Sequence, residues 1–372
     1  MDASARQRLI ALGEALINQQ AAQVIVPPQA DAEGYWFGGG NLVEGPNGDF
    51  YLVGRYRHAG DSRLGLGAGE RGLELAIFHS ADSRSVDRGR RFTKLASFAK
   101  GDLDVGERTV LSIEGSALHF TESGVELFVS TEKSNIGYPA GLEAFLKPNT
   151  GVWTIELLQA ATIAGLAEAT PKTILSCADP RWLHVKDPFL YEPGNGELVV
   201  GFCTHPYCWT SSNSAYSVRK PGTTAFSAPV FDFFPRGFAW DVAMSRATAW
   251  LPVPRVGVFA DLPPQTLIFY DGGESVRNLD EHKAAVSRPR GYSCEELGGL
   301  AVADASGVQH IERLSINQPL FVSPHGLGTS RYVDVLVTTE GYYATWQQSQ
   351  PDRSQPLVMN FLSHEEVHAI LK

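Results

Sequence analysis

The sequence predicts an all-β protein, a five-bladed β-propeller with a short N-terminal helix. The main observation is a segment that recurs three times, at 41–56, 116–131 and 188–203. Each copy has an apolar run, a polar turn centred on a glycine, and a second apolar run, as expected for two strands joined by a turn. The copies start 75 and 72 residues apart, a spacing typical of blades that each contain several strands.

Length and composition support the same fold class. The 372 residues include 37 Gly and 22 Pro, which favours many short strands joined by tight turns. No linker or change of composition divides the chain, so we expect a helical extension over 1–30 and one propeller domain over 31–372. A two-domain β-sandwich is the alternative. The carboxylates that precede two of the three copies favour the propeller, because a propeller brings such positions together on one axis.

The apolar runs predict the strands of each blade in turn. In blade one we expect strands near 40–45, 49–56, 73–80 and 92–98, and in blade two near 114, 125–131, 152–158 and 173–175. In blade three we expect strands from 186 and at 197–203, followed by a polar loop at 210–222. In blade four they are 244–253, 266–273, 298–305 and 310–314, and in blade five 330–337, 341–349 and 356–361.

The first residues predict an amphipathic helix packed on the domain. Apolar residues recur there at helical spacing: Leu9, Ile10, Leu12, Leu16 and Ile17. The segment lacks the apolar core and cleavage site of a signal peptide, and no run of 18 apolar residues occurs, so we expect a cytoplasmic protein without a membrane span. The helix offers an interface for a homo-oligomer. The net charge of −10 argues against nucleic acid as a partner.

Three carboxylates are placed where the blades are expected to begin. Glu114, Asp187 and Asp241 precede the first strands of blades two, three and four. Cleavage of a glycosidic bond needs a proton donor and a second carboxylate, and a shared pocket would raise the pKa of one of them. We assign Glu114 as proton donor, Asp187 as the group that activates water, and Asp241 as the residue that tunes the acid.

Other side chains complete a site for a small carbohydrate. Aromatic rings stack on sugars, and polar groups hydrogen-bond hydroxyls, although most such residues in a β domain are structural. The candidates for substrate binding are Trp36, Asn41, Arg55, His184, Trp240, Tyr292, Glu296 and His325. Glu295 and Glu296 precede an apolar strand much as Glu114 does, so one of them is an alternative for the acid. His205 is a weaker candidate, and Asp334 faces the axis or the outside depending on strand alternation.

No cofactor or metal is expected from the residues alone. Cys203, His205 and Cys208 have the spacing of soft metal ligands, but Cys203 ends a buried strand and no fourth ligand is evident nearby. The glycines of 65–72 resemble a dinucleotide fingerprint, yet a strand follows them where that motif requires a helix. We therefore interpret that segment as a loop at the rim of the propeller.

These residues resemble the superfamily of five-bladed glycoside hydrolases that includes families 32, 43, 68, 117 and 130. Residues 114–119 (EGSALH) are similar to the segment that carries the general acid in family 43, and 186–188 (KDP) to segments whose aspartate is catalytic. His325 corresponds to an axial histidine that the superfamily sometimes places near calcium. The resemblance implies a central pocket with paired carboxylates. The chain departs from it in blade one, where 36–41 (WFGGGN) contains no acid, and in placing Glu114 before Asp187.

The predicted function is that of a glycosidase that removes residues from the end of a small oligosaccharide or glycoside. Acids on separate blades leave room for a water, so we expect inversion at the anomeric carbon. Two alternatives stay open. The missing acid of blade one is compatible with a carbohydrate-binding propeller without catalysis, and a phosphorylase or lyase on the same fold would need Arg, Lys or His beside the acids to hold phosphate.

Overall fold

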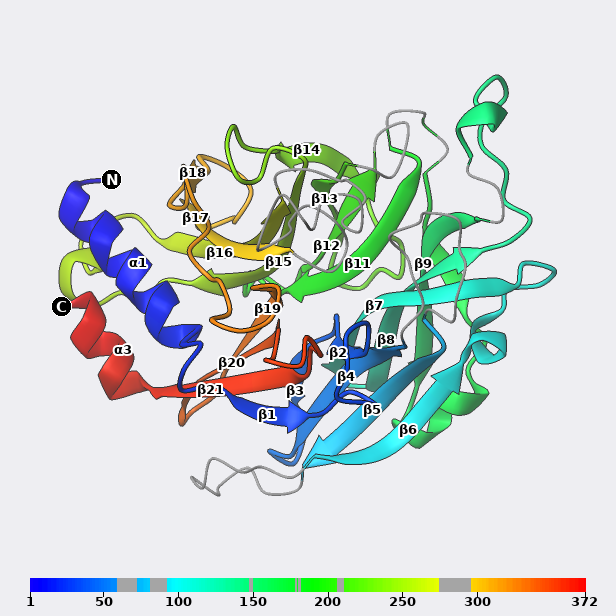
Figure 1. Cartoon of the computed structure of the whole chain (residues 1–372), viewed down its shortest axis with the longest axis horizontal. Coiled ribbons are helices and arrows are strands. Elements are labelled where there is room, and N and C mark those ends of the chain that lie inside the picture. Colours follow the sequence, from blue (N-terminus) through cyan, green and yellow to red (C-terminus); the bar gives the residue numbers. More distant parts are fainter. Residues whose placement is uncertain are drawn as a thin grey trace.

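The chain folds into a five-bladed β-propeller, which confirms the predicted fold class (Figure 1). The computed structural model describes residues 1–58, 72–80, 92–146, 150–177, 179, 182–205, 211–273 and 296–372. Within them, five antiparallel sheets surround one axis, and each contains four strands in meander order, with one further short strand in blade one. Three predicted or considered residues lie outside the described residues: Tyr292, Glu295 and Cys208. The glycine-rich segment 65–72 also lies outside them, except for Gly72.

The strands follow the predicted order, and blade two to blade four each use consecutive segments of the chain. Blade one contains β2 (Trp36–Gly38), β3 (Leu42–Glu44), β4 (Phe50–Arg57), β5 (Glu74–Ser80) and β6 (Thr93–Ala99). Blade two contains β7 (Val110–Thr121), β8 (Gly124–Lys133), β9 (Val152–Ala160) and β10 (Lys172–Leu175). Blade three contains β11 (His184–Tyr191), β12 (Leu198–His205), β13 (Asn213–Arg219) and β14 (Val230–Phe234). Blade four contains β15 (Met244–Pro252), β16 (Gln265–Gly273), β17 (Leu297–Asp304) and β18 (Glu312–Arg313).

Blade five joins the two ends of the chain. Its strands are β19 (Ser330–Val337), β20 (Gly341–Gln348) and β21 (Leu357–Ser363), and its outer strand is β1 (Gln23–Val26) from the N-terminal segment. β1 pairs with β21 in antiparallel register, so that Val24 lies opposite Val358. This strand was not predicted, because its four residues carry no alternating pattern of their own.

Two helices pack together beside blades four and five (Figure 1). The N-terminal helix α1 (Ala3–Leu16) was predicted and the C-terminal helix α3 (His364–Leu371) was not. Leu9, Leu12 and Leu16 are fully buried, and they belong to the same apolar cluster as Leu300 and Leu371. The apolar face of α1 is therefore used within the chain. Short 3₁₀ turns lie at Lys100–Leu103, Glu143–Phe145, Ala164–Glu168 and Gly257–Phe259.

The loop predicted at 210–222 is wrong in part, because β13 occupies most of it. The segment is polar in sequence, yet Ser214 is buried and its hydroxyl has partners in the neighbouring blade. Ser214 Oγ donates to the carbonyl of Ser245 and accepts from the amide of Ala247. Since these bonds offset the cost of burying a hydroxyl, a polar strand is stable at this position.

Candidate active site on the propeller axis

A backbone irregularity recurs in the innermost strand of four blades. The pairing register of β7, β11, β15 and β19 with its neighbour shifts at 113–116, 186–189, 247–249 and 331–334. In blade one, residues 39–41 separate β2 from β3, although both strands pair with β4. A bulge inserts extra residues and redirects side chains. In three of these blades the shifted residues include a member of one polar cluster: Glu114, Asp187 and Tyr332.

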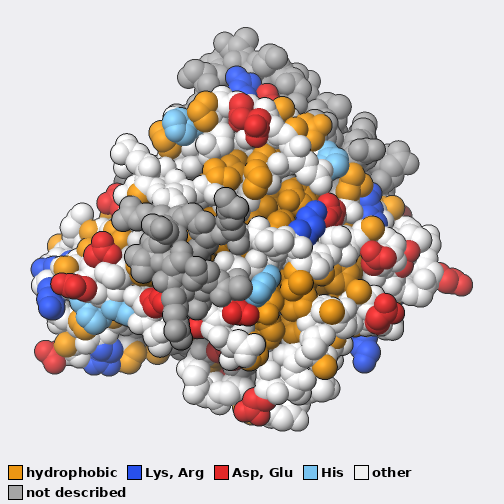
Figure 2. All heavy atoms as spheres, turned by 90° about the horizontal axis from the view of Figure 1, so that it is seen from below, with side chains coloured by type: hydrophobic (Ala, Val, Ile, Leu, Met, Phe, Trp, Pro, Cys, Tyr) orange, Lys and Arg blue, Asp and Glu red, His pale blue; other side chains and the backbone are white. Residues whose placement is uncertain are grey.

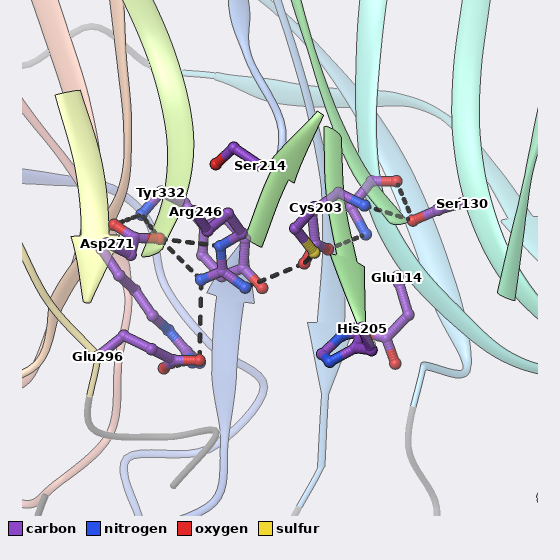
Figure 3. Close-up of polar contacts among 12 residues, drawn as sticks. Glu114, Ser130, Cys203, His205, Ser214, Arg246, Asp271, Glu296 and Tyr332 are labelled. Carbon is purple, nitrogen blue, oxygen red and sulfur yellow. Dashed lines mark hydrogen bonds and ion pairs between the residues drawn. The ribbon is translucent and has the colours of Figure 1, made fainter. Parts of the chain in front are cut away.

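Arg246 forms the centre of an ion cluster on that axis (Figure 3). Its Nη1 lies 3.0 Å from Asp187 Oδ2, and its Nη2 lies 2.7 Å from Asp271 Oδ2. The Oε1 of Glu296 is 3.7 Å from the same Nη2. One buried guanidinium therefore connects carboxylates that come from blade three and blade four.

Glu114 belongs to the same group of buried charges. Its Oε2 lies 3.0 Å from Nη2 of Arg55, and its Oε1 accepts a hydrogen bond from the Ser112 hydroxyl. The amide of Gly115, the next residue, donates to Asp187 Oδ1 at 3.0 Å. A Cβ atom at Gly115 would stand 2.7 Å from the Asp187 backbone, so only glycine allows the two strands to approach this closely. The structure thus brings Glu114 and Asp187 together.

Arginines and aromatic rings alternate beside the carboxylates. The guanidinium carbons of Arg55 and Arg331 lie 4.6 and 4.7 Å from the centre of the Trp36 ring. In blade five the ring is that of Tyr332, and the guanidinium carbon of Arg246 lies 4.1 Å from its centre. Arg331 also forms an ion pair with Glu296. Trp36 is therefore a fully enclosed packing partner of cations rather than an open platform for a sugar.

The cations determine the charge of the central carboxylates. Burial alone would raise the pKa of Glu114, but Arg55, followed by Lys186 and Arg57, lowers it to about 2. Burial also opposes ionisation of Asp187, and Arg246 and Lys186 nevertheless hold its pKa well below the usual range. The expectation that mutual repulsion raises the pKa of one of these two acids is wrong, because the neighbouring cations outweigh the repulsion.

Asp271 differs from the other two acids. Burial raises the pKa of Asp271 to about 6, although Arg246 and the amide of Tyr332 act in the opposite direction. Its two oxygens accept hydrogen bonds from that amide and from Arg246. Asp271 accordingly changes protonation closer to neutral pH than Glu114 or Asp187 does.

Two histidines beside the cluster have different roles. His184 uses both ring nitrogens, since its Nδ1 accepts from the amide of Trp153 and its Nε2 contacts the Tyr138 hydroxyl at 2.6 Å. Burial lowers the pKa of His184 to about 3. His205 Nδ1 lies 2.6 Å from the carbonyl of Ser211, which requires a proton on Nδ1 and leaves Nε2 as an acceptor in the neutral ring. Burial lowers the pKa of His205 far enough to keep it neutral.

Four other predicted residues have partners away from these charges. Asn41 exchanges two hydrogen bonds with the backbone of Leu118 and so joins blade one to blade two. Trp240 donates to the carbonyl of Ser315 and stacks on Tyr270. Asp241 accepts from Tyr270 and from Arg313 Nε at 2.9 Å. His325 lies exposed in a turn before β19.

The residues that the sequence interpretation missed are Arg246, Asp271, Arg331 and Tyr332. All four lie within apolar strands, and an ionisable residue inside such a run is the signal that would have identified Arg246 and Asp271. The local sequence does not predict which strands pair across the axis. Their common role therefore becomes visible only after the blades close.

Among the described residues, no three His, Cys, Asp or Glu side chains are arranged to hold a metal ion. Cys203 is buried and its Sγ points to Asp187 Oδ2 at 3.6 Å. No helix in the described part of the chain is long and apolar enough to cross a membrane.

Comparison with solved structures extends the assignment of the fold. No protein-family model and no curated protein sequence matches the chain. The structure is similar to that of a thermostable family-43 glycoside hydrolase, with 10% identity, a TM-score of 0.55, and coverage of 90% of this chain and 91% of the other. It is also similar to an α-L-arabinofuranosidase from Lactobacillus brevis, with 9% identity, a TM-score of 0.56, and coverage of 92% and 93%.

A third similar structure is a β-1,2-mannobiose phosphorylase from Listeria innocua, with 11% identity, a TM-score of 0.54, and coverage of 93% and 96%. The matches extend over nearly the whole of both chains in each case. The chain therefore has the five-bladed propeller fold of these carbohydrate-cleaving proteins, as the resemblance of its motifs implies. Identities near 10% establish the fold and leave the chemistry to be argued from the site.

Proposed function

We propose that the chain is a glycoside-cleaving enzyme whose active site is the axial cluster. The observation that supports this most directly is the pairing of Glu114 and Asp187, two buried carboxylates from adjacent blades linked through the Gly115 amide. Cleavage of a glycosidic bond requires two carboxyl groups around one anomeric centre. The similar solved structures also favour this chemistry, because they are a glycoside hydrolase, an arabinofuranosidase and a phosphorylase.

We assign the roles as follows. Glu114 donates the proton to the leaving oxygen, and the ionised Asp187 activates the attacking water and stabilises positive charge on the sugar ring. Both Asp187 oxygens already accept hydrogen bonds, so the water shares one of them with Gly115 or Arg246. Asp271, rather than Asp241, is the third carboxyl of the site, because it shares Arg246 with Asp187.

The low pKa of Glu114 sets a condition for this mechanism. A carboxyl with a pKa of about 2 is ionised at neutral pH and cannot donate a proton. Substrate must therefore reduce the influence of Arg55 and Lys186 when it binds. When those cations are neutralised, the effect of burial prevails and raises the pKa of Glu114.

Kinetics with a panel of aryl glycosides and short oligosaccharides test the function. We expect Glu114→Gln and Asp187→Asn each to lower kcat by about 10²–10⁴-fold, the usual contribution of general acid or base catalysis. Asp49→Asn is the control, since Asp49 pairs with His79 outside the cluster. Unchanged activity in both active-site variants would refute the assignment.

Product analysis tests the finer features of the proposal. We propose exo-action and inversion; an inverting enzyme holds a water between the acid and the base. Proton NMR of the product immediately after cleavage distinguishes the two anomers. Chain-length analysis of the released sugar distinguishes removal of end units from internal cleavage.

A carbohydrate-binding protein without catalysis is the second candidate. It is favoured by blade one, where Gly39 and the Arg55 guanidinium occupy the region in which the resemblance implies an acid. Sugar binding in calorimetry without turnover of any member of the panel would support this candidate over the enzyme.

A further inference from the structure

The axial site gathers positive charge in an acidic protein. Among the described residues, five cations surround the cluster: Arg55, Arg57, Lys186, Arg246 and Arg331. They face four carboxylates, those of Glu114, Asp187, Asp271 and Glu296. The whole chain carries a net charge of −10, and on the face drawn in Figure 2 the visible Lys and Arg side chains lie scattered among acidic ones. The concentration of cations on the axis is thus a property of the site.

Part of Arg55 has no partner in this cluster. Its Nη2 donates to Glu114 and to the Tyr332 hydroxyl, whereas Nη1 and Nε are buried without a hydrogen-bond partner among the described residues. A Cβ atom on Gly39 would lie only 1.9 Å from Nη1. The guanidinium therefore fills the space that a side chain of blade one would occupy. A buried donor without a partner is destabilising, so it is a strong site for an acceptor.

Lys186 provides a second cation without a close anionic partner. In the described part of the chain its ammonium makes no hydrogen bond and no ion pair within 4 Å, and its nearest aromatic contact is Trp153 at 5.6 Å. Arg55 and Lys186 nevertheless act on the same two carboxylates, Glu114 and Asp187. Arg55 binds Glu114, whose neighbour Gly115 donates to Asp187, and Lys186 directly precedes Asp187 in β11. The two cations therefore belong to the surroundings of the same pair of carboxylates.

We infer that this region binds an oxyanion, held by Arg55 Nη1 and Nε and by the Lys186 ammonium. The oxyanion is a phosphate that acts as co-substrate or a carboxylate carried by the sugar itself, and both present the same acceptor oxygens. The neutral His205, whose Nε2 is a buried acceptor without a partner among the described residues, would accept a hydroxyl of the attached or neighbouring sugar. This inference deepens the proposed function and rests on it for the identity of the ligand as a carbohydrate.

Anion binding would also supply the condition that Glu114 requires. The charged or titratable groups that face Glu114 are Arg55 and Arg57 from β4, Lys186 and Asp187 from β11, and, near Lys186, His205 from β12. An oxyanion on Arg55 and Lys186 cancels the two largest attractive charges acting on the carboxylate. Glu114 then takes up a proton as the ligand binds, and it becomes the donor that cleavage needs.

Calorimetry with three probes tests the inference on the whole chain. The probes are inorganic phosphate, D-glucuronate and neutral D-glucose, each titrated at pH 7 and low salt. Binding of phosphate identifies a co-substrate, and binding of glucuronate more tightly than glucose, without phosphate binding, identifies a charged sugar. Failure of both anions to bind overturns the inference.

Variants show whether the bound anion occupies this site. We expect Lys186→Gln to weaken binding about tenfold and Arg55→Lys at least as much, because each removes one charge or one pair of donors. Arg219→Gln, which breaks a comparable ion pair with Glu126 at 2.6 Å, controls for loss of a partly buried guanidinium and should bind normally. Equal affinity in Lys186→Gln and wild type would overturn the inference, even if Arg55→Lys does not fold.

The proton count separates this inference from the proposed function. Titrations in two buffers of different ionisation enthalpy should show more net proton uptake by wild type than by Glu114→Gln, because any proton exchanged by the anion itself is common to both. Anion binding without cleavage of any glycoside would support the oxyanion site and contradict the enzyme. Cleavage of neutral glycosides in phosphate-free buffer, with no anion binding, would support the enzyme and contradict the oxyanion site.

Discussion

At the scale of single residues, blade one is defined by the contact between Gly39 and Arg55. Gly39 has φ +72°, in the left-handed region, and its missing side chain leaves room for the Arg55 guanidinium. The guanidinium in turn holds Glu114 ionised through its Nη2. A backbone position without any side chain thus influences the charge of the proposed proton donor.

Substitution of Gly39 should reveal this dependence. We expect Gly39→Ala to lower the free energy of unfolding by about 2–4 kcal/mol, measured by urea denaturation, because the methyl group is strained at this φ and collides with Arg55. Gly106→Ala is the matched control. Its φ of +59° imposes similar strain, but nothing lies within 4 Å of the added atom, so about 1 kcal/mol is expected. Equal losses in both variants would contradict a specific clash with Arg55.

The sequence predicted Glu114, Asp187 and Glu296 as candidates, and all three belong to the ion cluster. It also predicted Asp241 and His325, and nothing in the sequence showed that these two lie away from the cluster. An acid next to an apolar strand is visible in the sequence, but the direction in which a bulge turns it is not. Asp241 lies just before β15 and its side chain turns to Arg313, while Arg246 in the same strand faces the axis. Arg246 and Arg331 were missed for the same reason, since each has a partner in another blade.

At the scale of elements, blades two and three are joined by a network at the ends of their strands. His119 on β7 contacts Glu126 on β8 through Nδ1 and Glu192 beyond β11 through Nε2. Arg219 at the end of β13 also binds Glu126. Burial alone would lower the pKa of His119, but its hydrogen bonds to the two glutamates raise it to about 9.

This network makes the stability of the junction dependent on pH. A raised pKa in the folded state stabilises the protein fully below the unfolded pKa of about 6.5, and the contribution is lost as the pH rises through about 9. We expect His119→Gln to reduce the free energy of unfolding by about 1–3 kcal/mol at pH 6 and by little at pH 9.5. Urea denaturation at the two pH values measures the difference. A cost that is the same at both would exclude a charged histidine.

The elements differ in how well the sequence predicted them. Strands with apolar runs, such as β16 and β20, were found close to their observed bounds. β13 was missed because its polar residues include Ser214, which is buried through hydrogen bonds to the next blade. β1 was missed because it is four residues long and pairs with β21 more than 300 positions away. The local sequence pattern predicts a strand when the buried residues are apolar. It fails for polar or short segments that are buried because they hydrogen-bond to a distant part of the chain.

At the scale of the whole molecule, the N-terminal segment completes the propeller. β1 provides the outer strand of blade five, and α1 covers an apolar surface that includes Leu300 and Leu371. The first residues of the chain thus stabilise its last blade. Closure of this kind makes the circle of blades a single cooperative unit rather than a row of independent sheets.

Substitutions in α1 test this contribution. We expect Leu12→Ala to lower the free energy of unfolding by about 2–5 kcal/mol, because the side chain is fully buried. Glu14→Ala on the exposed side of the same helix should change it by less than about 0.5 kcal/mol. Urea unfolding of both variants gives the comparison. A small effect of Leu12→Ala would show that the helix is dispensable for the propeller.

The repeated bulge of the inner strands has a consequence for how such a site can change over evolution. The bulges are formed by backbone pairing, so blades two, three and five can exchange their bulge residue without rebuilding the sheet. Positions 187 and 332 have positive φ, which restricts the choice of residue there. Blade one is the exception, because a carboxylate at Gly39 would need the simultaneous removal of the Arg55 guanidinium. A single mutation in either position gives a clash or an uncompensated Glu114. The bulge residues are therefore easier to exchange than Gly39 of blade one, where introduction of an acid requires two coordinated substitutions.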